Sequence, residues 1–251
     1  MKKLEAVGIF LIISFICSIN IFIVQLIFSI FTDFNNYIYT ITGVGNCITL
    51  FLIYTFLSKK NKHLITAEQF RKISFKNIIY ISLIGFVSSI FVSQLTSLLI
   101  YIFPSYIEIS KQSSTAANSL TQLITILIIA PIYEEVVFRG IILGHIENDK
   151  NIVGSIFLQA ILFGLIHGNT VQCIYASLFG IVLGLIYLEC KSILGCILAH
   201  IVYNVCAVFI TPQLYINQNL SFIILVIGII VLVFEFIKRV PNYKRKYSNN
   251  I

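Results

Sequence analysis

Two neighbouring glutamates and an arginine, Glu134, Glu135 and Arg139, stand within an otherwise apolar stretch of about 27 residues, 120–146. A charged side chain at membrane depth costs roughly 2.5 to 3.5 kcal/mol on insertion scales, so residues of this kind are functional candidates. Glu135 and Arg139 are four residues apart, share a face of a helix and can neutralise each other. Glu134 points about 100° away and is free to face another group. The stretch therefore predicts one paired carboxylate and one available for chemistry.

Two later apolar stretches supply imidazoles and an amide. The first contains Phe163 and His167, and the second contains His200 and Asn204, in each case one helical turn apart. A carboxylate that is linked through water to a histidine can act as a general base and activate that water for attack on a peptide carbonyl. A second imidazole and an amide NH₂ are donors suited to the oxyanion that develops. We therefore predict a hydrolytic site built from three helices.

Pro131 and several glycines favour the close packing that such a site needs. Pro131 lies one turn before Glu134, so it removes a helical hydrogen bond, bends the helix and frees a carbonyl. A bend there would open a water pocket beside the glutamate. Pairs of glycines four apart allow helices to approach closely. These pairs are Gly140 and Gly144, Gly164 and Gly168, and Gly180 and Gly184.

Each polar group also has a structural explanation when it is taken alone. Glu135 and Arg139 can form a purely structural ion pair, and His200 and Asn204 can be interhelical hydrogen-bonding residues. A histidine at a helix end, such as His167, is common near the membrane interface. The coincidence of all these groups in three consecutive polar motifs favours the functional interpretation.

The segments EEVVFR, FGLIH and HIVYN resemble, in order and spacing, the EExxxR, FxxxH and HxxxN motifs of the CAAX prenyl protease and bacteriocin-processing family, also called Abi proteins. Members of that family are intramembrane endopeptidases. The resemblance covers about residues 120–210. Each motif alone is a weak signal, but three in order, each within an apolar stretch, form a strong one.

The resemblance implies catalytic roles by position. Glu134 with His167 would activate the water, and His200 with Asn204 would stabilise the oxyanion. It leaves the substrate open, because the family includes prenyl-protein processing, maturation of peptides such as signalling pheromones and bacteriocins, and bacteriocin self-immunity.

The same resemblance implies supporting roles for three residues. Glu135 and Arg139 would support the site as a pair, and Phe163 would be a packing residue of its motif.

The residues leave two mechanisms open. A glutamate and a histidine can activate water directly, or a zinc ion can be held by His167, His200 and Glu134 with water as the fourth ligand. No HExxH motif is present. If Glu134 bound the zinc ion, Glu135 would have to act as the base, yet Glu135 is expected to pair with Arg139. The mechanism without a metal or other cofactor is therefore favoured.

Two other classes of function compete with the protease. Buried Glu and His can relay protons in a transporter, but the sequence has no inverted repeat with paired broken helices. A non-catalytic immunity or scaffold protein that binds a membrane partner is the stronger alternative.

The elements that must position these residues are membrane helices. Hydrophobic residues make up 58% of the 251-residue chain and charged residues 11%, with a mean hydropathy of +0.97, which does not suit a water-exposed surface. We predict an all-α polytopic transmembrane helical bundle, one membrane domain over 1–251 with the motifs in a core at 119–210. A span needs about 20 apolar residues. The eight predicted spans lie near 7–31, 37–57, 78–102, 120–146, 152–168, 171–188, 192–210 and 220–237.

The distribution of basic residues predicts the orientation. All Lys and Arg except Lys111 and Arg139 fall on one side of the eight-span arrangement, so both termini are expected in the cytoplasm. The net charge of +7 is therefore better explained by basic residues that face the anionic cytoplasmic leaflet than by binding of a nucleic acid. The expected partners are the lipid bilayer and a membrane-associated peptide or small protein, and the expected location is the cell membrane of an AT-rich bacterium. Segment 104–118 is predicted to be a flexible external connection, and 67–75 either a short interfacial helix or a solvated loop.

Overall fold

The computed structural model describes residues 1–31, 37–59, 65–116, 119–147, 151–214 and 218–247, and this part of the chain contains helices and no strand. The all-α helical bundle that the sequence predicts is confirmed. The α-helices, 3₁₀-helices (η2, η5) and π-helices (η3, η4) are, in chain order, α1 Lys2–Phe31, α2 Ile38–Lys59, η2 Ala67–Phe70, α3 Phe75–Ile102, α4 Tyr106–Ala116, α5 Leu120–Ile124, η3 Thr125–Ile129, α6 Ala130–Glu135, η4 Val136–Leu143, α7 Gly144–Ile146, α8 Ile152–Leu165, α9 Thr170–Cys190, α10 Ile193–Phe209, η5 Thr211–Gln213 and α11 Gln218–Tyr247.

All eight stretches predicted to span the membrane contain a helix over most of their length. Within the described residues, five helices are long and apolar enough to cross a bilayer: α1, Ile38–Phe56 of α2, α3, α9, and α10 together with η5. Two further apolar helices are shorter, namely α8 and Phe222–Glu235 of α11. The chain is therefore a polytopic membrane protein, whereas the number of eight crossings stays a prediction.

The stretch 120–146 is one run in which α-helical and π-helical segments alternate, from α5 through η3, α6 and η4 to α7. In η3 the N–H of Ala130 donates to the carbonyl of Thr125, five residues back. The next residue is Pro131, which has no N–H to donate, so the carbonyl of Ile126 loses its partner in this register. The predicted irregularity is confirmed, and it takes the form of two π-helices.

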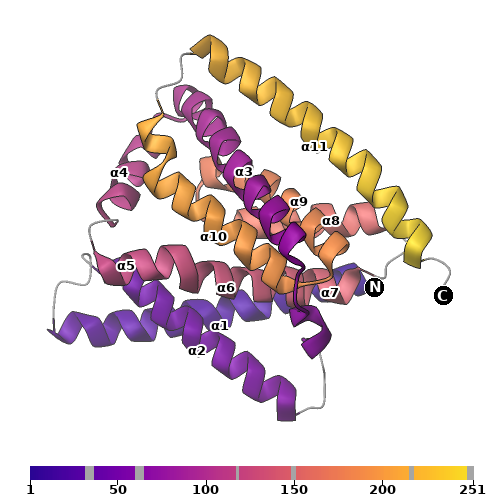
Figure 1. Ribbon diagram of the computed structural model, residues 1–251. Coiled ribbons are helices and arrows are strands. Elements are labelled where there is room, and N and C mark those ends of the chain that lie inside the picture. Colours follow the sequence, from indigo (N-terminus) through magenta and orange to yellow (C-terminus); the bar gives the residue numbers. More distant parts are fainter. Residues whose placement is uncertain (32–36, 60–64, 117–118, 148–150, 215–217, 248–251) are drawn as a thin grey trace.

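Helix α9 runs through the middle of the bundle, and the outer helices surround it (Figure 1). In its most apolar segment 61% of the residues are buried, a larger share than in any of the other four long apolar helices of the described residues. Helix α1 shows how an outer helix is divided between protein and lipid. Its buried residues recur every three or four positions, which is a single helical stripe. They are Ala6, Phe10, Ile13, Cys17, Asn20 and Val24. Large apolar residues on its other faces, such as Phe15 and Phe22, are exposed and suit contact with lipid.

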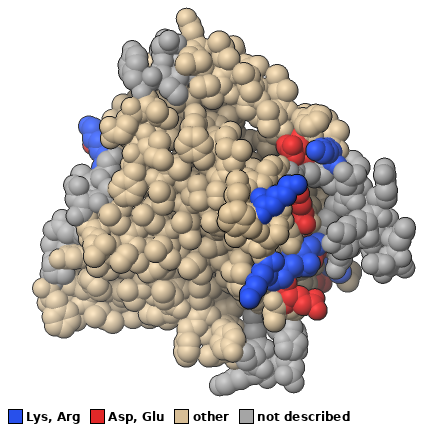
Figure 2. All heavy atoms as spheres, in the orientation of Figure 1, with Lys and Arg blue, Asp and Glu red and all other residues tan. Residues whose placement is uncertain are grey.

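One end of the bundle collects the start of α1, the end of α11, η2 and α7 (Figure 1). On the face shown in Figure 2, most of the visible charged side chains gather toward that same end. Two chain ends on one side agree with an even number of crossings. That this side is cytoplasmic stays a prediction, and Lys60, Lys62 and Lys150, which contributed to it, lie outside the described residues.

Three connections differ from expectation or refine it. Segment 104–118 is not simply a flexible connection, because it contains helix α4, whose Tyr106 is buried against Leu99 and Val171. That aromatic anchor outweighs the polar residues that suggested a loop. Of segment 67–75, residues Ala67–Phe70 form the short 3₁₀-helix η2; its position at the membrane interface stays a prediction. Helix α8 ends at Leu165, so His167 lies just beyond it.

Candidate active site

The two glutamates of α6 meet one histidine of α10. The Nδ1 atom of His200 lies 2.8 Å from Oε1 of Glu135, and the Nε2 atom of the same ring lies 3.6 Å from Oε2 of Glu134. The side chain of Glu135 is fully buried, whereas that of Glu134 is 18% exposed. One imidazole therefore bridges the neighbouring carboxylates, although on a helix they point in different directions.

Arg139 of η4 completes this charged group from within the protein. Its Nη1 donates to Oε1 of Glu135 at 2.8 Å, and its Nη2 donates to the carbonyl of Gly180 at 3.3 Å; both charged side chains are fully buried. A buried ion pair is costly unless its remaining donors and acceptors are hydrogen-bonded; here Nη2 of Arg139 is, whereas Nε of Arg139 and Oε2 of Glu135 have no protein partner among the described residues. The guanidinium also stacks on the ring of Phe163, with Cζ 4.5 Å from the ring centre. The ion pair that the spacing of Glu135 and Arg139 predicts is thus formed, whereas its supporting role in a site stays a prediction.

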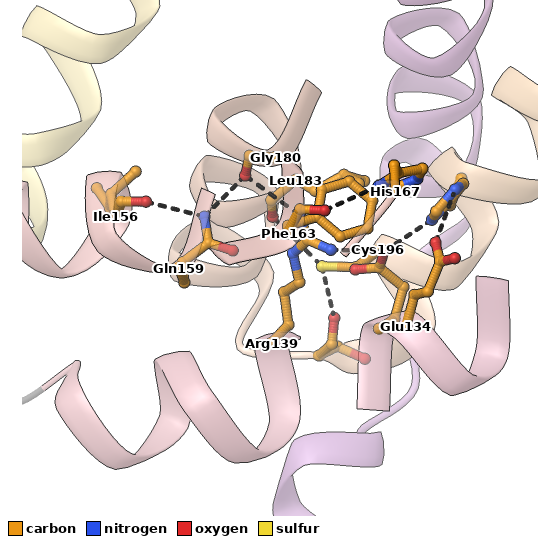
Figure 3. A network of polar contacts seen from close by, with 12 residues as sticks. Glu134, Arg139, Ile156, Gln159, Phe163, His167, Gly180, Leu183 and Cys196 are labelled. Carbon is orange, nitrogen blue, oxygen red and sulfur yellow. Dashed lines mark hydrogen bonds and ion pairs between the residues drawn. The ribbon is translucent and has the colours of Figure 1, made fainter. Parts of the chain in front are cut away.

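Phe163 of α8 contacts three of the polar residues. Besides Arg139, its ring meets the imidazoles of His167 and His200 edge-on, at centroid distances of 5.2 and 5.9 Å. Figure 3 shows Phe163 between Arg139 and His167, with Glu134 nearby. The packing residue of the second motif therefore fixes the relative positions of the other two motifs.

His167 lies in the turn after α8, beside Gly168, whose φ of +71° is in the left-handed region. Its Nδ1 is 2.9 Å from the carbonyl of Phe163. A carbonyl only accepts hydrogen bonds, so Nδ1 carries the proton and Nε2 of the neutral ring is left as an acceptor. Among the described residues Glu134 pairs with His200, and no direct hydrogen bond joins it to His167.

Asn204 of α10 is held by the irregular helix. Its Nδ2 donates to the carbonyl of Ile126 at 2.8 Å, the same carbonyl that loses a backbone donor because residue 131 is a proline. This contact leaves the second N–H of the amide for another acceptor. Pro131 thus links the irregular register of this helix to the orientation of a predicted site residue.

Several residues around the site were not singled out from the sequence. Phe179 meets His200 edge-on at 5.4 Å and stacks on Tyr203 at 4.2 Å, so aromatic rings enclose the imidazole. Gln159 binds the carbonyl of Gly180. A glutamine inside an apolar stretch was a signal that could have drawn attention to Gln159, whereas nothing local marks Phe179.

A zinc site made of His167, His200 and Glu134 was the alternative from the sequence. Within the described part of the chain, no three His, Cys, Asp or Glu side chains are grouped closely enough to hold a metal ion. The three residues, as arranged here, do not fit a zinc site.

Comparisons with known proteins find similarity in the part of the chain that carries these residues. Residues 116–206 match the family described as type II CAAX prenyl endopeptidase, Rce1-like. This part of the chain, about a third of its length, is similar to that family. A curated protein of Bacillus subtilis (strain 168), named "Putative membrane peptidase YdiL", is 27% identical over 104 residues, which are 40% of this chain and 43% of that protein. No solved structure gave a significant match.

The Rce1-like segment begins before α5 and ends within α10, so it includes all three polar motifs. The family resemblance is therefore confirmed for the part of the chain that forms the site. The match to the curated protein spans less than half of that protein's length. Helices α1, α2, α3 and α11 lie outside residues 116–206, the part that matches the family model.

Proposed function

We propose that the chain is an intramembrane endopeptidase that hydrolyses a peptide bond in a membrane-associated peptide or small protein. The observation that carries the proposal is the convergence of Glu134, Glu135 and His200, at 3.6 and 2.8 Å, inside the Rce1-like segment. Two carboxylates and an imidazole that meet in an apolar environment are expensive to maintain without a function.

In this proposal Glu134 and His167 activate the water. Glu134 is the more exposed of the two glutamates and so the one that water reaches. His167 offers Nε2 as an acceptor because its Nδ1 donates to Phe163. A water between the two side chains transfers a proton to Glu134, its oxygen bonds to the scissile carbonyl carbon, and the carbonyl oxygen becomes an oxyanion.

His200 and Asn204 are proposed as the oxyanion donors. Nδ1 of His200 donates to Glu135, so Nε2 can also donate only when the ring is an imidazolium. That form balances the charges of the group, since His200 and Arg139 are then two cations against two carboxylates. Asn204 contributes the N–H that the Ile126 carbonyl leaves free. The intermediate collapses when the proton on Glu134 passes to the leaving amine and the C–N bond breaks.

The test compares wild type with Glu134→Ala and His167→Ala in producing cells, and mass spectrometry follows small membrane-associated peptides. His145→Ala is the matched control. His145 pairs with Glu5 and lies before the start of α8, whereas His167 lies after its end. We expect both site variants to reach wild-type abundance in the membrane and to accumulate the same uncut precursor, while the control cleaves normally. The identity of that precursor would distinguish pheromone, bacteriocin and CAAX-type substrates.

Two further outcomes are informative. Because the proposed mechanism uses no metal, 1,10-phenanthroline should leave cleavage by purified protein unchanged, and a loss of activity that zinc restores would contradict it. If peptide profiles are the same in all variants while a wild-type phenotype persists, the non-catalytic immunity or scaffold role takes the place of the protease.

A further inference from the structure

Gln159 is a fully buried polar residue in the middle of α8, and it is not part of the three motifs. Its Nε2 donates to the carbonyl of Ile156 on the same helix at 3.0 Å and to the carbonyl of Gly180 on α9 at 2.8 Å. An uncharged amide inside a membrane bundle also costs free energy unless it is hydrogen-bonded. Its presence next to the charged group therefore requires a reason.

Gln159 and Arg139 share one acceptor. The carbonyl of Gly180 receives Nε2 of Gln159 and Nη2 of Arg139, and the two side chains approach it from different helices (Figure 3). Each side chain also has one buried atom without a protein partner, an acceptor (Oε1 of Gln159) and a donor (Nε of Arg139). Figure 3 shows the carboxamide oxygen of Gln159 pointing toward the guanidinium. The two side chains are thus chemically complementary.

The glycines of α9 make room for this contact. A Cβ at Gly184 would lie 2.9 Å from Nε2 of Gln159, and a Cβ at Gly180 would lie 3.0 Å from Cα of Ala160. The first distance is shorter than real Cβ contacts, and the second is tighter than most of them. The close approach of α8 and α9 therefore depends on small residues and brings the Gly180 carbonyl within reach of both donors.

We infer that Gln159 is a positioning residue of the site. Together with the Gly180 carbonyl it fixes the guanidinium of Arg139. The guanidinium orients Glu135, and Glu135 in turn orients the ring of His200. The inference rests on the proposed function and adds a residue that the motifs do not contain. The hydrogen bonds that carry it run from α8 through α9 and η4 to α6 and α10, with lengths of 2.8, 3.3, 2.8 and 2.8 Å.

The simpler role is that Gln159 only joins two helices. Ser155 is a suitable control for that role, since it is fully buried on the same helix and donates to the carbonyls of Ile146 at 3.0 Å and Asn151 at 3.2 Å, neither of which belongs to the charged group. Gln159→Met keeps the volume and removes both polar atoms. Gln159→Glu keeps the shape but replaces the donor by a carboxylate that competes with Glu135 for Arg139.

The first measurement is cleavage of the precursor found above by full-length protein in proteoliposomes. We expect kcat of Gln159→Met and Gln159→Glu to fall by about tenfold to a hundredfold with KM within about twofold, because misplaced catalytic groups lower the chemical step. Ser155→Ala should keep kcat within about twofold. Equal losses in Gln159→Met and Ser155→Ala, or losses that follow thermal stability alone, would overturn the inference.

The second measurement does not depend on activity, so it separates a failure of this inference from a failure of the proposed function. Protein labelled with ¹⁵N-histidine gives ring signals for His200, which His200→Gln assigns by their loss. We expect these signals to shift in Gln159→Met and to stay in place in Ser155→Ala. Unchanged His200 signals in Gln159→Met would show that Gln159 does not position the ring.

Discussion

The ring of His200 connects the two glutamates in a way that their positions in the sequence do not indicate. On a helix adjacent residues diverge by about 100°, yet Glu134 and Glu135 approach opposite nitrogens of the same imidazole. The two ring nitrogens lie on different sides of the imidazole, so each can face one of the two diverging carboxylates. The charges are thereby shared among four side chains, which is a less expensive arrangement than separate buried ions.

Asn204 is the residue whose proposed role is easiest to separate from stability. Its one Nδ2 contact with a carbonyl anchors the amide, and the remaining N–H is the proposed oxyanion donor. We predict that Asn204→Leu lowers kcat about a hundredfold, as loss of one oxyanion donor does in other hydrolases, while KM changes little.

Cys206→Ala is the control for this prediction, since Cys206 is buried on the same helix two residues further along. Steady-state cleavage by both variants, with thermal stability measured in parallel, provides the comparison. If Asn204→Leu raised KM and left kcat unchanged, the amide would bind substrate rather than stabilise the oxyanion.

At the scale of elements, the irregular stretch 120–146 fixes the orientation of the Asn204 side chain. Pro131 lacks the N–H that the register of η3 would direct to the carbonyl of Ile126, and Asn204 takes that carbonyl. We predict that Pro131→Ala restores a competing backbone donor and lowers kcat, about tenfold, by releasing the amide from its fixed orientation. The helix itself should become no less stable, because alanine is the better helix former.

Circular dichroism and thermal unfolding of Pro131→Ala, measured beside its kcat, test this prediction. Ile132→Ala is a matched control on the next residue, whose side chain is exposed on the outside of the bundle. A Pro131→Ala protein with normal kcat would mean that the proline serves folding alone.

Much of this architecture follows from the sequence, and the remainder depends on tertiary contacts. Apolar length predicted every long helix, and the ion pair of Glu135 and Arg139 followed from a spacing of four. The π-helical register did not follow, since local preferences do not encode it and η4 is buried along its whole length. Helix α4 was missed for a similar reason, because its anchor Tyr106 packs against residues far away in the chain.

At the scale of the whole molecule, the two ends of the bundle differ in charge and in their distance from the site. Lys3 donates to the carbonyl of Asn151 at the start of α8, so α8 runs from the end with the N-terminus toward the opposite end. His167 follows the last turn of α8 and therefore lies toward that opposite end, where α4 also packs against the start of α9. There, Lys111 is paired with Glu108 at 2.9 Å.

We predict that the end with both termini faces the cytoplasm and that α4 faces outward, because the basic residues collect at the terminal end. Epitope tags at the N-terminus, at the C-terminus and after α4 test this in intact and permeabilised cells. We expect antibodies to reach only the tag after α4 in intact cells, and all three tags after permeabilisation. Termini on opposite faces would mean an odd number of crossings. Accessible termini with a protected α4 tag would reverse the orientation and place His167 nearer the cytoplasm, so that substrate would be cut from the inner side and not from the outer one.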